Sequence, residues 1–170
     1  SLWLIALLGA GAGCRQEMPA GPSVAPSKPS ATDQAQPRLA TLKVWVGREE
    51  LVAELARTSS EIMRGMMFRT HVAENEAMLF VFPRPHRASF WMKNVPIPLS
   101  CAYIDPEGVI LETHRMEPFN EKPIEARSSR IQYVLETAEG WFERHGIQTG
   151  AVVRTELGSL SETFQGRRAR

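Results

Sequence analysis

Two closely spaced prolines interrupt an apolar stretch in the middle of this 170-residue chain. The stretch 88–105 reads ASFWMKNVPIPLSCAYID, with Pro96 and Pro98 near its centre. Proline has no amide hydrogen to donate and cannot continue a central strand, so Pro96 and Pro98 end the first apolar run. The stretch therefore predicts two short strands around a stiff elbow.

Lys93 and Asn94 stand at this elbow, directly after the Phe-Trp-Met block 90–92. A lysine and a carboxamide fixed beside apolar bulk are suited to contacting a ligand. A purely local role is the alternative, in which Lys93 protects a strand edge and Asn94 closes a turn. The sequence leaves both interpretations open.

Short apolar runs elsewhere predict further strands, and two segments predict helices. Each run alternates or is continuously apolar and is bounded by turn residues; the runs are 41–46, 51–57, 78–82, 99–104, 109–113, 130–136 and 152–153. The Asp-Pro-Glu-Gly sequence 105–108 is typical of a type I turn, which would join two runs as a hairpin. Prolines 83 and 85 indicate a stiff loop.

The helix signals lie at two places. Thr58 and Glu61 have the spacing of a capping box, which predicts a helix at 59–67. Thr137 and Gly146 are suitable caps for a second helix at 138–145. We therefore expect a mainly β fold (α+β by element count): one antiparallel β-sandwich with two short helices. Five side chains should lie mainly inside: Phe80, Phe90, Met92, Ile104 and Leu135.

Four segments of the chain also resemble one known family. They are the Phe-Trp-Met-Lys-Asn sequence 90–94 with Ile-Pro-Leu 97–99, the Arg-Gly-Met-Met-Phe-Arg sequence 64–69, the run 78–82, and 134–136 with Gly140 and Gly146. These segments, in their order along the chain, resemble the DUF192 family of uncharacterised bacterial and archaeal proteins, over residues 51–153. The resemblance implies a compact, jelly-roll-like β domain and implies no reaction. The chain departs from the pattern at four positions: Ala77, Val95, Ser100 and Ala151.

The N-terminal region predicts export. Residues 2–8 are apolar, and glycine and alanine alternate from 9 to 13 before Cys14. This is typical of a secretory signal, and a cysteine after small residues resembles a lipoprotein processing site. We expect lipidation of Cys14 and a membrane-anchored protein on the periplasmic side of the cell envelope. The alternative is an ordinary signal peptide with an incidental Cys14.

Composition divides the chain into four parts. The signal-like region is 1–14, and a Pro/Ala/Ser-rich linker that we expect to be disordered is 15–38. The folded domain is expected at 39–158, followed by a basic disordered tail at 159–170. A formal net charge of +1 gives no electrostatic reason to bind nucleic acid.

A ligand site is expected where loops and strand ends meet. Arg64 and Arg69 flank the end of the first predicted helix, and Glu136 ends a predicted strand. Together with Lys93 and Asn94 they would form one cluster at one end of the sandwich. Each also has a local explanation: Arg64 suits a helix C-terminus, and Glu136 could accept from helix N–H groups.

The absence of standard motifs favours a binding module over an enzyme. The chain has no phosphate-binding glycine loop, Cys-x-x-Cys, His-Glu-x-x-His or Gly-x-Ser-x-Gly. We expect an accessory module for a small anionic ligand or an envelope protein, with no cofactor or metal. One alternative is an enzyme of unrecognised class using Lys93, Asn94 and Glu136. Another is a copper protein using Met and His side chains, although methionine is more often core filling. Cys101 is expected to be a small buried residue rather than a nucleophile.

Overall fold

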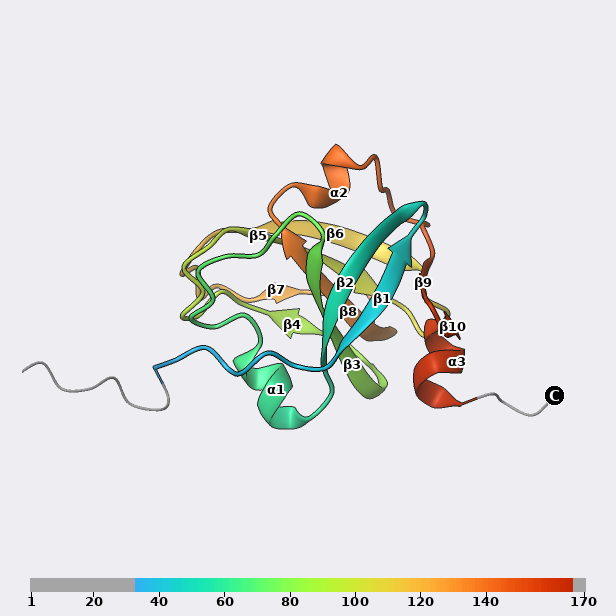
Figure 1. Cartoon of the computed structure of the whole chain (residues 1–170), viewed down its shortest axis with the longest axis horizontal. Coiled ribbons are helices and arrows are strands. Elements are labelled where there is room, and N and C mark those ends of the chain that lie inside the picture. Colours follow the sequence, from blue (N-terminus) through green and yellow to red (C-terminus); the bar gives the residue numbers. More distant parts are fainter. Residues whose placement is uncertain (1–32, 167–170) are drawn as a thin grey trace, which may run out of the picture.

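The computed structural model describes residues 33–166 (Figure 1). The predicted signal and lipidation site at 1–14, most of the predicted linker and residues 167–170 lie outside this range. Ten strands and three helices form the described part: β1 (Thr41–Val46), β2 (Glu49–Ala56), α1 (Ser59–Arg64), β3 (Glu76–His86), β4 (Ser89–Phe90), β5 (Leu99–Ile104), β6 (Ile110–Met116), β7 (Ile124–Glu125), β8 (Ile131–Ala138), α2 (Trp141–Arg144), β9 (Val153–Thr155), β10 (Gly158–Ser159) and α3 (Leu160–Gln165).

Eight of these strands form one sheet in the order β10-β9-β1-β2-β3-β8-β5-β6, and β4 pairs with β7 in a small second sheet. The mainly β fold predicted from the sequence is confirmed. Neighbouring strands are antiparallel, as expected, except β2 and β3, which run parallel. A parallel pair needs a crossover, and residues 57–75 with α1 supply it. The sheet curls until Val109 bridges Val152, so its two ends approach each other (Figure 1).

The elbow and the hairpin form as the sequence predicted. Strand β4 ends before the elbow and β5 begins after Pro98. In the turn that follows β5, the Asp105 carboxylate accepts from the backbone N–H groups of Glu107 and Val109 at 3.0 and 2.8 Å, which fixes the β5–β6 hairpin.

Three local predictions were wrong at their boundaries. Pro83 and Pro85 lie within β3, where a register irregularity between Val81 and His86 and exposed side chains accommodate them. Strand β8 continues to Ala138, so Thr137 is buried in the sheet rather than capping a helix. Gly140, with φ of 69°, precedes α2 instead, and α1 ends at Arg64 rather than near residue 67.

The folded domain is also longer than predicted at both ends. Gln36, inside the predicted linker, is buried and donates to the carbonyl of Gly65 at 2.9 Å. At the other end, α3 occupies half of the predicted disordered tail, and its Leu160 is fully buried. A capping box between Ser159 and Glu162 starts this helix. The boundaries 39 and 158 therefore cut into packed structure.

Buried apolar side chains form two groups, one on each face of the central strands. The inner cluster lies where the sheet curls over itself and is closed by α2 and α3; its large members are Leu51, Leu79, Ile104, Tyr133, Leu135, Trp141, Phe142 and Leu160. The outer cluster lies between the other face and α1, the elbow and the small sheet; its large members are Met78, Phe80, Met92, Leu99, Tyr103 and Val134. Four side chains expected inside are fully buried, and Phe90 is partly buried against the outer cluster.

Candidate functional site

A cavity of about 400 Å³ opens on the outer side of the domain, beside the outer cluster. Helix α1 and the residues after it form one wall, the elbow forms a second, and strands β3 and β8 form the floor. Its apolar lining consists of Ile62, Met63, Met66, Met67, Phe80, Phe82, Phe90, Trp91 and Val95. This size and lining match the pockets that proteins use for small organic ligands.

The end of α1 is shaped to fit this cavity. The helix is held by its capping box, in which Glu61 accepts from the Thr58 N–H at 2.8 Å. Gly65 then ends the helix with φ of 42°, and a β-carbon at this position would lie 3.3 Å from the Phe80 ring. Glycine therefore lets the chain turn closely over the cavity floor, with Met66 and Met67 following in the wall.

The elbow is held by backbone hydrogen bonds on both sides. Asn94 has φ of 58°, a left-handed conformation that asparagine tolerates, and its carbonyl accepts from Phe68 N–H at 2.7 Å. On the opposite side, Met92 N–H donates to the Asn120 carbonyl at 2.8 Å. The elbow is thus fixed between the segment after α1 and the 117–120 loop. The turn-closing role considered for Asn94 is therefore performed by its backbone.

Lys93 and Trp91 form the accessible edge of the cavity. The Lys93 ammonium lies 5.3 Å from the centre of the Trp91 ring, within the range of a cation–π contact. Trp91 is 44% exposed, an unusual degree for a side chain of this size. A basic group on an exposed aromatic surface gives this edge positive charge next to apolar area.

Glu136 lies in the cavity floor and is only 4% exposed. It sits on β8 opposite Met78 of β3 and Cys101 of β5. Within residues 33–166, its carboxyl has no hydrogen bond or ion pair. Burial raises its pKa to about 8, so the side chain is mainly a neutral carboxylic acid at pH 7.

Four of the five residues predicted to share a site line this cavity: Arg64, Lys93, Asn94 and Glu136. The Arg64 guanidinium also donates to the Gln34 carbonyl at 2.7 Å. The predicted interaction of Glu136 with helix N–H groups does not form, because β8 continues beyond this residue and α2 starts only at Trp141.

The fifth predicted residue, Arg69, does not line the cavity. Its guanidinium forms an ion pair at 3.0 Å with Glu54, a buried carboxylate on β2. Glu54 also accepts from Arg38 at 2.7 Å and from the Leu39 N–H at 2.7 Å. The inclusion of Arg69 in the shared site is therefore corrected: this arginine pairs with a buried acid 15 residues away that no sequence pattern links to it.

The cavity also contains residues that the site prediction omitted. His86 lines it from the end of β3 and stacks edge-on against Phe82, with ring centres 4.3 Å apart. Met63, Met66 and Met67 line it too, and their thioethers are the kind of ligand that the copper alternative requires. Met66 is buried in the outer cluster as packing. Among residues 33–166, no group of three or more His, Cys, Asp and Glu side chains could hold a metal ion.

Cys101 is fully buried, and burial raises the pKa of its thiol. Nucleophilic attack needs an accessible thiolate. The expectation that Cys101 is a small buried residue is therefore confirmed.

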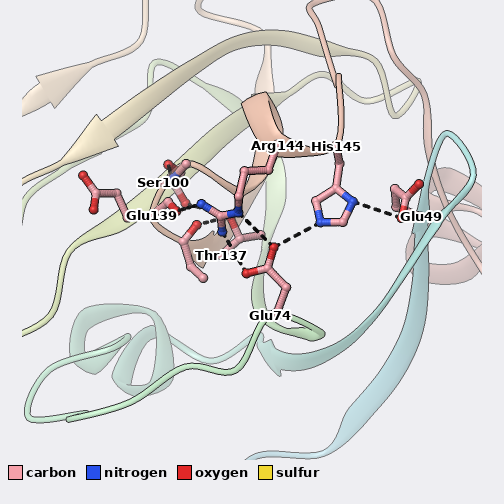
Figure 2. Close-up of polar contacts among 9 residues, drawn as sticks. Glu49, Glu74, Ser100, Thr137, Glu139, Arg144 and His145 are labelled. Carbon is pink, nitrogen blue, oxygen red and sulfur yellow. Dashed lines mark hydrogen bonds and ion pairs between the residues drawn. The ribbon is translucent and has the colours of Figure 1, made fainter.

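A second polar cluster joins α2 to the sheet (Figure 2). Arg144 pairs with Glu74 at 2.8 Å, and His145 lies 3.1 Å from both Glu74 and Glu49. The His145 ring stacks on Trp141 with ring centres 4.5 Å apart. Each of these polar side chains has a partner and the cluster is largely exposed, so its geometry explains how α2 is fastened over the inner cluster. It leaves no unpaired group for a ligand.

Ser100 of β5 also contacts the chain at the start of α2. It is buried, and its hydroxyl accepts from the Gly140 N–H at 2.9 Å just before α2 (Figure 2). Ser100, one of the four departures from the family pattern, thus has a structural role at the start of this helix. No helix in residues 33–166 has the length and hydropathy required to cross a membrane.

Comparisons with known proteins identify a family but no activity. The model of the DUF192 family, described as "Uncharacterized ACR", matches residues 42–155. A crystal structure from Sinorhizobium meliloti, described as a "putative transcription regulator", is 29% identical, with a TM-score of 0.68 over 71% of this chain and 97% of that one. A protein of unknown function from Novosphingobium aromaticivorans is 31% identical, with a TM-score of 0.66 over 75% of this chain and 99% of that one. Among curated proteins, nothing matches.

Proposed function

Because the chain belongs to the DUF192 family, which is described as uncharacterised, we propose a function from its cavity: the domain binds a small organic anion with an apolar body. The apolar body would lie against Phe80, Phe82 and Phe90. The anionic group would lie at the edge formed by Lys93 and Arg64. Pockets of this kind combine apolar walls with a few polar groups that fix orientation.

One observation carries this proposal: the charge of the cavity lining is positive. Lys93 and Arg64 line it, and Glu136 is the single acidic residue among the lining residues. Since burial raises the Glu136 pKa to about 8, this acid contributes little negative charge at pH 7. A concave apolar surface with basic groups at its edge favours small anions over a flat protein partner.

The cellular setting remains the one inferred from residues 1–38. We propose that Cys14 is lipidated and that the linker holds the domain near the membrane on the periplasmic side. The apolar run before Gly-Ala-Gly-Cys supports this. Mass spectrometry of the mature N-terminus tests it: a lipid-modified Cys14 is expected, and a mature chain that starts elsewhere or carries an unmodified Cys14 would overturn it.

A catalytic role is the second candidate, and the position of Glu136 is what favours it. A carboxyl with a raised pKa in an apolar pocket that Lys93 and Asn94 also line has the properties of a general acid. A binding module returns its ligand unchanged, whereas an enzyme converts it. Mass spectrometry of the probe after prolonged incubation with the protein separates the two, because a new product would favour the enzyme.

The binding proposal is tested with a matched pair of probes, 4-isopropylphenylacetate and its uncharged methyl ester. NMR titration of the ¹⁵N-labelled protein reports the amides of the cavity and the Trp91 indole. We expect the anion to bind saturably with a dissociation constant of about 1 mM or tighter, as its size allows. The ester should bind about fivefold more weakly, since it lacks the charge.

Two lysine variants locate the anion. Lys93→Met should weaken binding of the anion about fivefold and leave the ester unaffected. The control is Lys43→Met, because Lys43 pairs with Glu50 on β1 and β2 and does not line the cavity. Absence of saturable binding, or an equal effect of both variants, would refute the proposal.

A further inference from the structure

The buried acid in the cavity floor specifies the ligand further. Resting on the proposed function above, we propose that the cavity selects organic anions whose apolar body carries an acceptor oxygen, such as a ketone, at the end remote from the charge. Glu136 donates a hydrogen bond to this oxygen. The inference concerns which anions bind, whereas the proposed function concerns whether anions bind.

The first argument is the missing partner of Glu136. Its side chain is 4% exposed, yet its carboxyl has no hydrogen bond or ion pair within residues 33–166. In these residues the side-chain atoms shut off from solvent without a partner are Arg69 Nε and the Tyr133 hydroxyl, so the Glu136 oxygens keep contact with the cavity space, where a hydrogen-bond partner is favourable. Because Glu136 borders the cavity, a ligand in the cavity can supply the partner.

The second argument is the protonation state. Burial raises the Glu136 pKa to about 8, so near neutral pH the carboxyl is a donor. Two titratable groups on β5 lie near Glu136, the Cys101 thiol and the Tyr103 hydroxyl. Burial is the main cause of the raised pKa of both, so both keep their own protons and do not take the proton of Glu136. Met78 faces it from β3 and does not titrate.

The third argument is the separation of the two polar ends of the cavity. Lys93 lies at the accessible edge, over Trp91, whereas Glu136 lies in the buried floor. Although both line one cavity, no ion pair joins them within 4.0 Å in residues 33–166. Aromatic rings of Phe80 and Phe90, 4.9 Å apart, lie along the same cavity. A ligand that contacts both ends therefore needs an anion, an apolar body and then an acceptor.

The test compares two anions of similar size, 4-acetylphenylacetate and 4-isopropylphenylacetate, of which only the first carries an acceptor oxygen at the end remote from the charge. With the wild-type protein at about pH 6.5, the acetyl probe should bind about fivefold more tightly, the effect of one hydrogen bond. At about pH 9.5 this preference should disappear, because the carboxyl of Glu136 has lost its proton. NMR titration measures all four dissociation constants.

Two substitutions separate donation from packing. Glu136→Gln keeps a donor that does not titrate, so the preference should persist at both pH values. Glu136→Met removes the donor at similar length, so both probes should bind equally at either pH. His86→Gln is the control for the histidine that also lines the cavity and should leave the pH dependence of the preference unchanged.

The outcomes distinguish the inference from the proposed function. If both probes bind wild type equally at both pH values, the inference fails and the anion-binding function stands. If neither probe binds, the proposed function fails first. If 4-isopropylbenzyltrimethylammonium binds more tightly than the anions, Glu136 acts as an anionic partner of cations, and both are overturned.

Discussion

The two faces of β8 contain neighbouring residues with opposite roles. Tyr133 and Leu135 point into the inner cluster, which α2 and α3 close completely. Val134 and Glu136 lie on the outer side, where α1 and the elbow leave a cavity of about 400 Å³. The same strand thus supplies closed packing on one face and an unpaired acid on the other. We therefore expect the inner face to contribute mainly stability and the outer face to hold the proposed ligand site.

The two faces of the sheet are covered by different elements, which explains this difference. The inner face is covered by large apolar side chains from two helices, Trp141, Phe142 and Leu160, each at most 1% exposed. The outer face is covered by the six-residue helix α1 and by an elbow whose prolines cannot extend a strand. Helix α1 has no fully buried side chain, unlike α2 and α3, and this cover leaves room for a ligand next to Glu136.

The largest expected effect separates the two faces directly. Leu135→Ala removes a fully buried side chain of the inner cluster and should lower the unfolding free energy by about 3 kcal/mol. Phe90→Ala, on the partly buried outer side, should cost about half as much and weaken binding of 4-isopropylphenylacetate. Urea unfolding and NMR titration measure the two effects. Weaker probe binding in the Leu135 variant without loss in the Phe90 variant would reverse the assignment.

The next largest effect concerns Glu136 and depends on pH. Its folded pKa of about 8 lies above its ordinary value of 4.5. Between these values the folded protein binds more protons than the unfolded chain, so the unfolding free energy falls as pH rises and levels off above pH 8. Glu136→Met lacks this loss and should exceed wild type by roughly 3 kcal/mol at pH 9. Its advantage should shrink towards pH 5. A difference between the two proteins that is independent of pH would show that Glu136 is not a buried proton-binding group.

A third effect separates Arg69 from Lys93, two basic residues that the sequence analysis placed in the same site. Arg69→Met deprives the buried Glu54 of one partner and should cost about 2 kcal/mol, with probe binding unchanged. Lys93→Met should do the opposite, changing stability by less than about 1 kcal/mol and weakening the anionic probe. Urea midpoints and probe titrations on both variants are the measurement. If both variants changed stability and probe binding to the same extent, Lys93 would not be a ligand contact distinct from the internal ion pair of Arg69.

The smallest effect is expected at the exposed cluster over α2. Glu74→Gln breaks ion pairs of largely exposed side chains, and such pairs contribute little. The urea midpoint should hardly move at moderate salt, and probe binding should stay the same. A large loss of stability would show that these ion pairs hold α2 in place more strongly than the packing of Trp141 and Phe142 does.

The sequence predicted those features whose causes are local. The capping box of α1, the hairpin turn at 105–108 and the buried run 78–82 each depend on residues a few positions apart. Thus Phe80, Met92 and Leu135 were placed inside correctly. The same reasoning could have found α3, because Ser159 and Glu162 repeat the capping-box spacing used for Thr58 and Glu61.

Other features depend on contacts that are distant in sequence and could not be read from it. Arg69 is occupied by Glu54, 15 residues away on a strand that gave no sign of holding a buried acid. The prolines of β3 are tolerated because their side chains are exposed at an irregular part of the strand. Grouping Arg64, Lys93, Asn94 and Glu136 was feasible because all four stand near the ends of elements, which tend to meet.

The pairing of β1 with β9 has a consequence for how the chain folds. Val44 and Thr155 are partners in the ladder, although 111 positions separate them. The first strand therefore cannot complete its pairing until the end of the domain has left the ribosome. Contacts of such high sequence separation slow folding. During synthesis β1 therefore presents an unpaired edge until β9 is available.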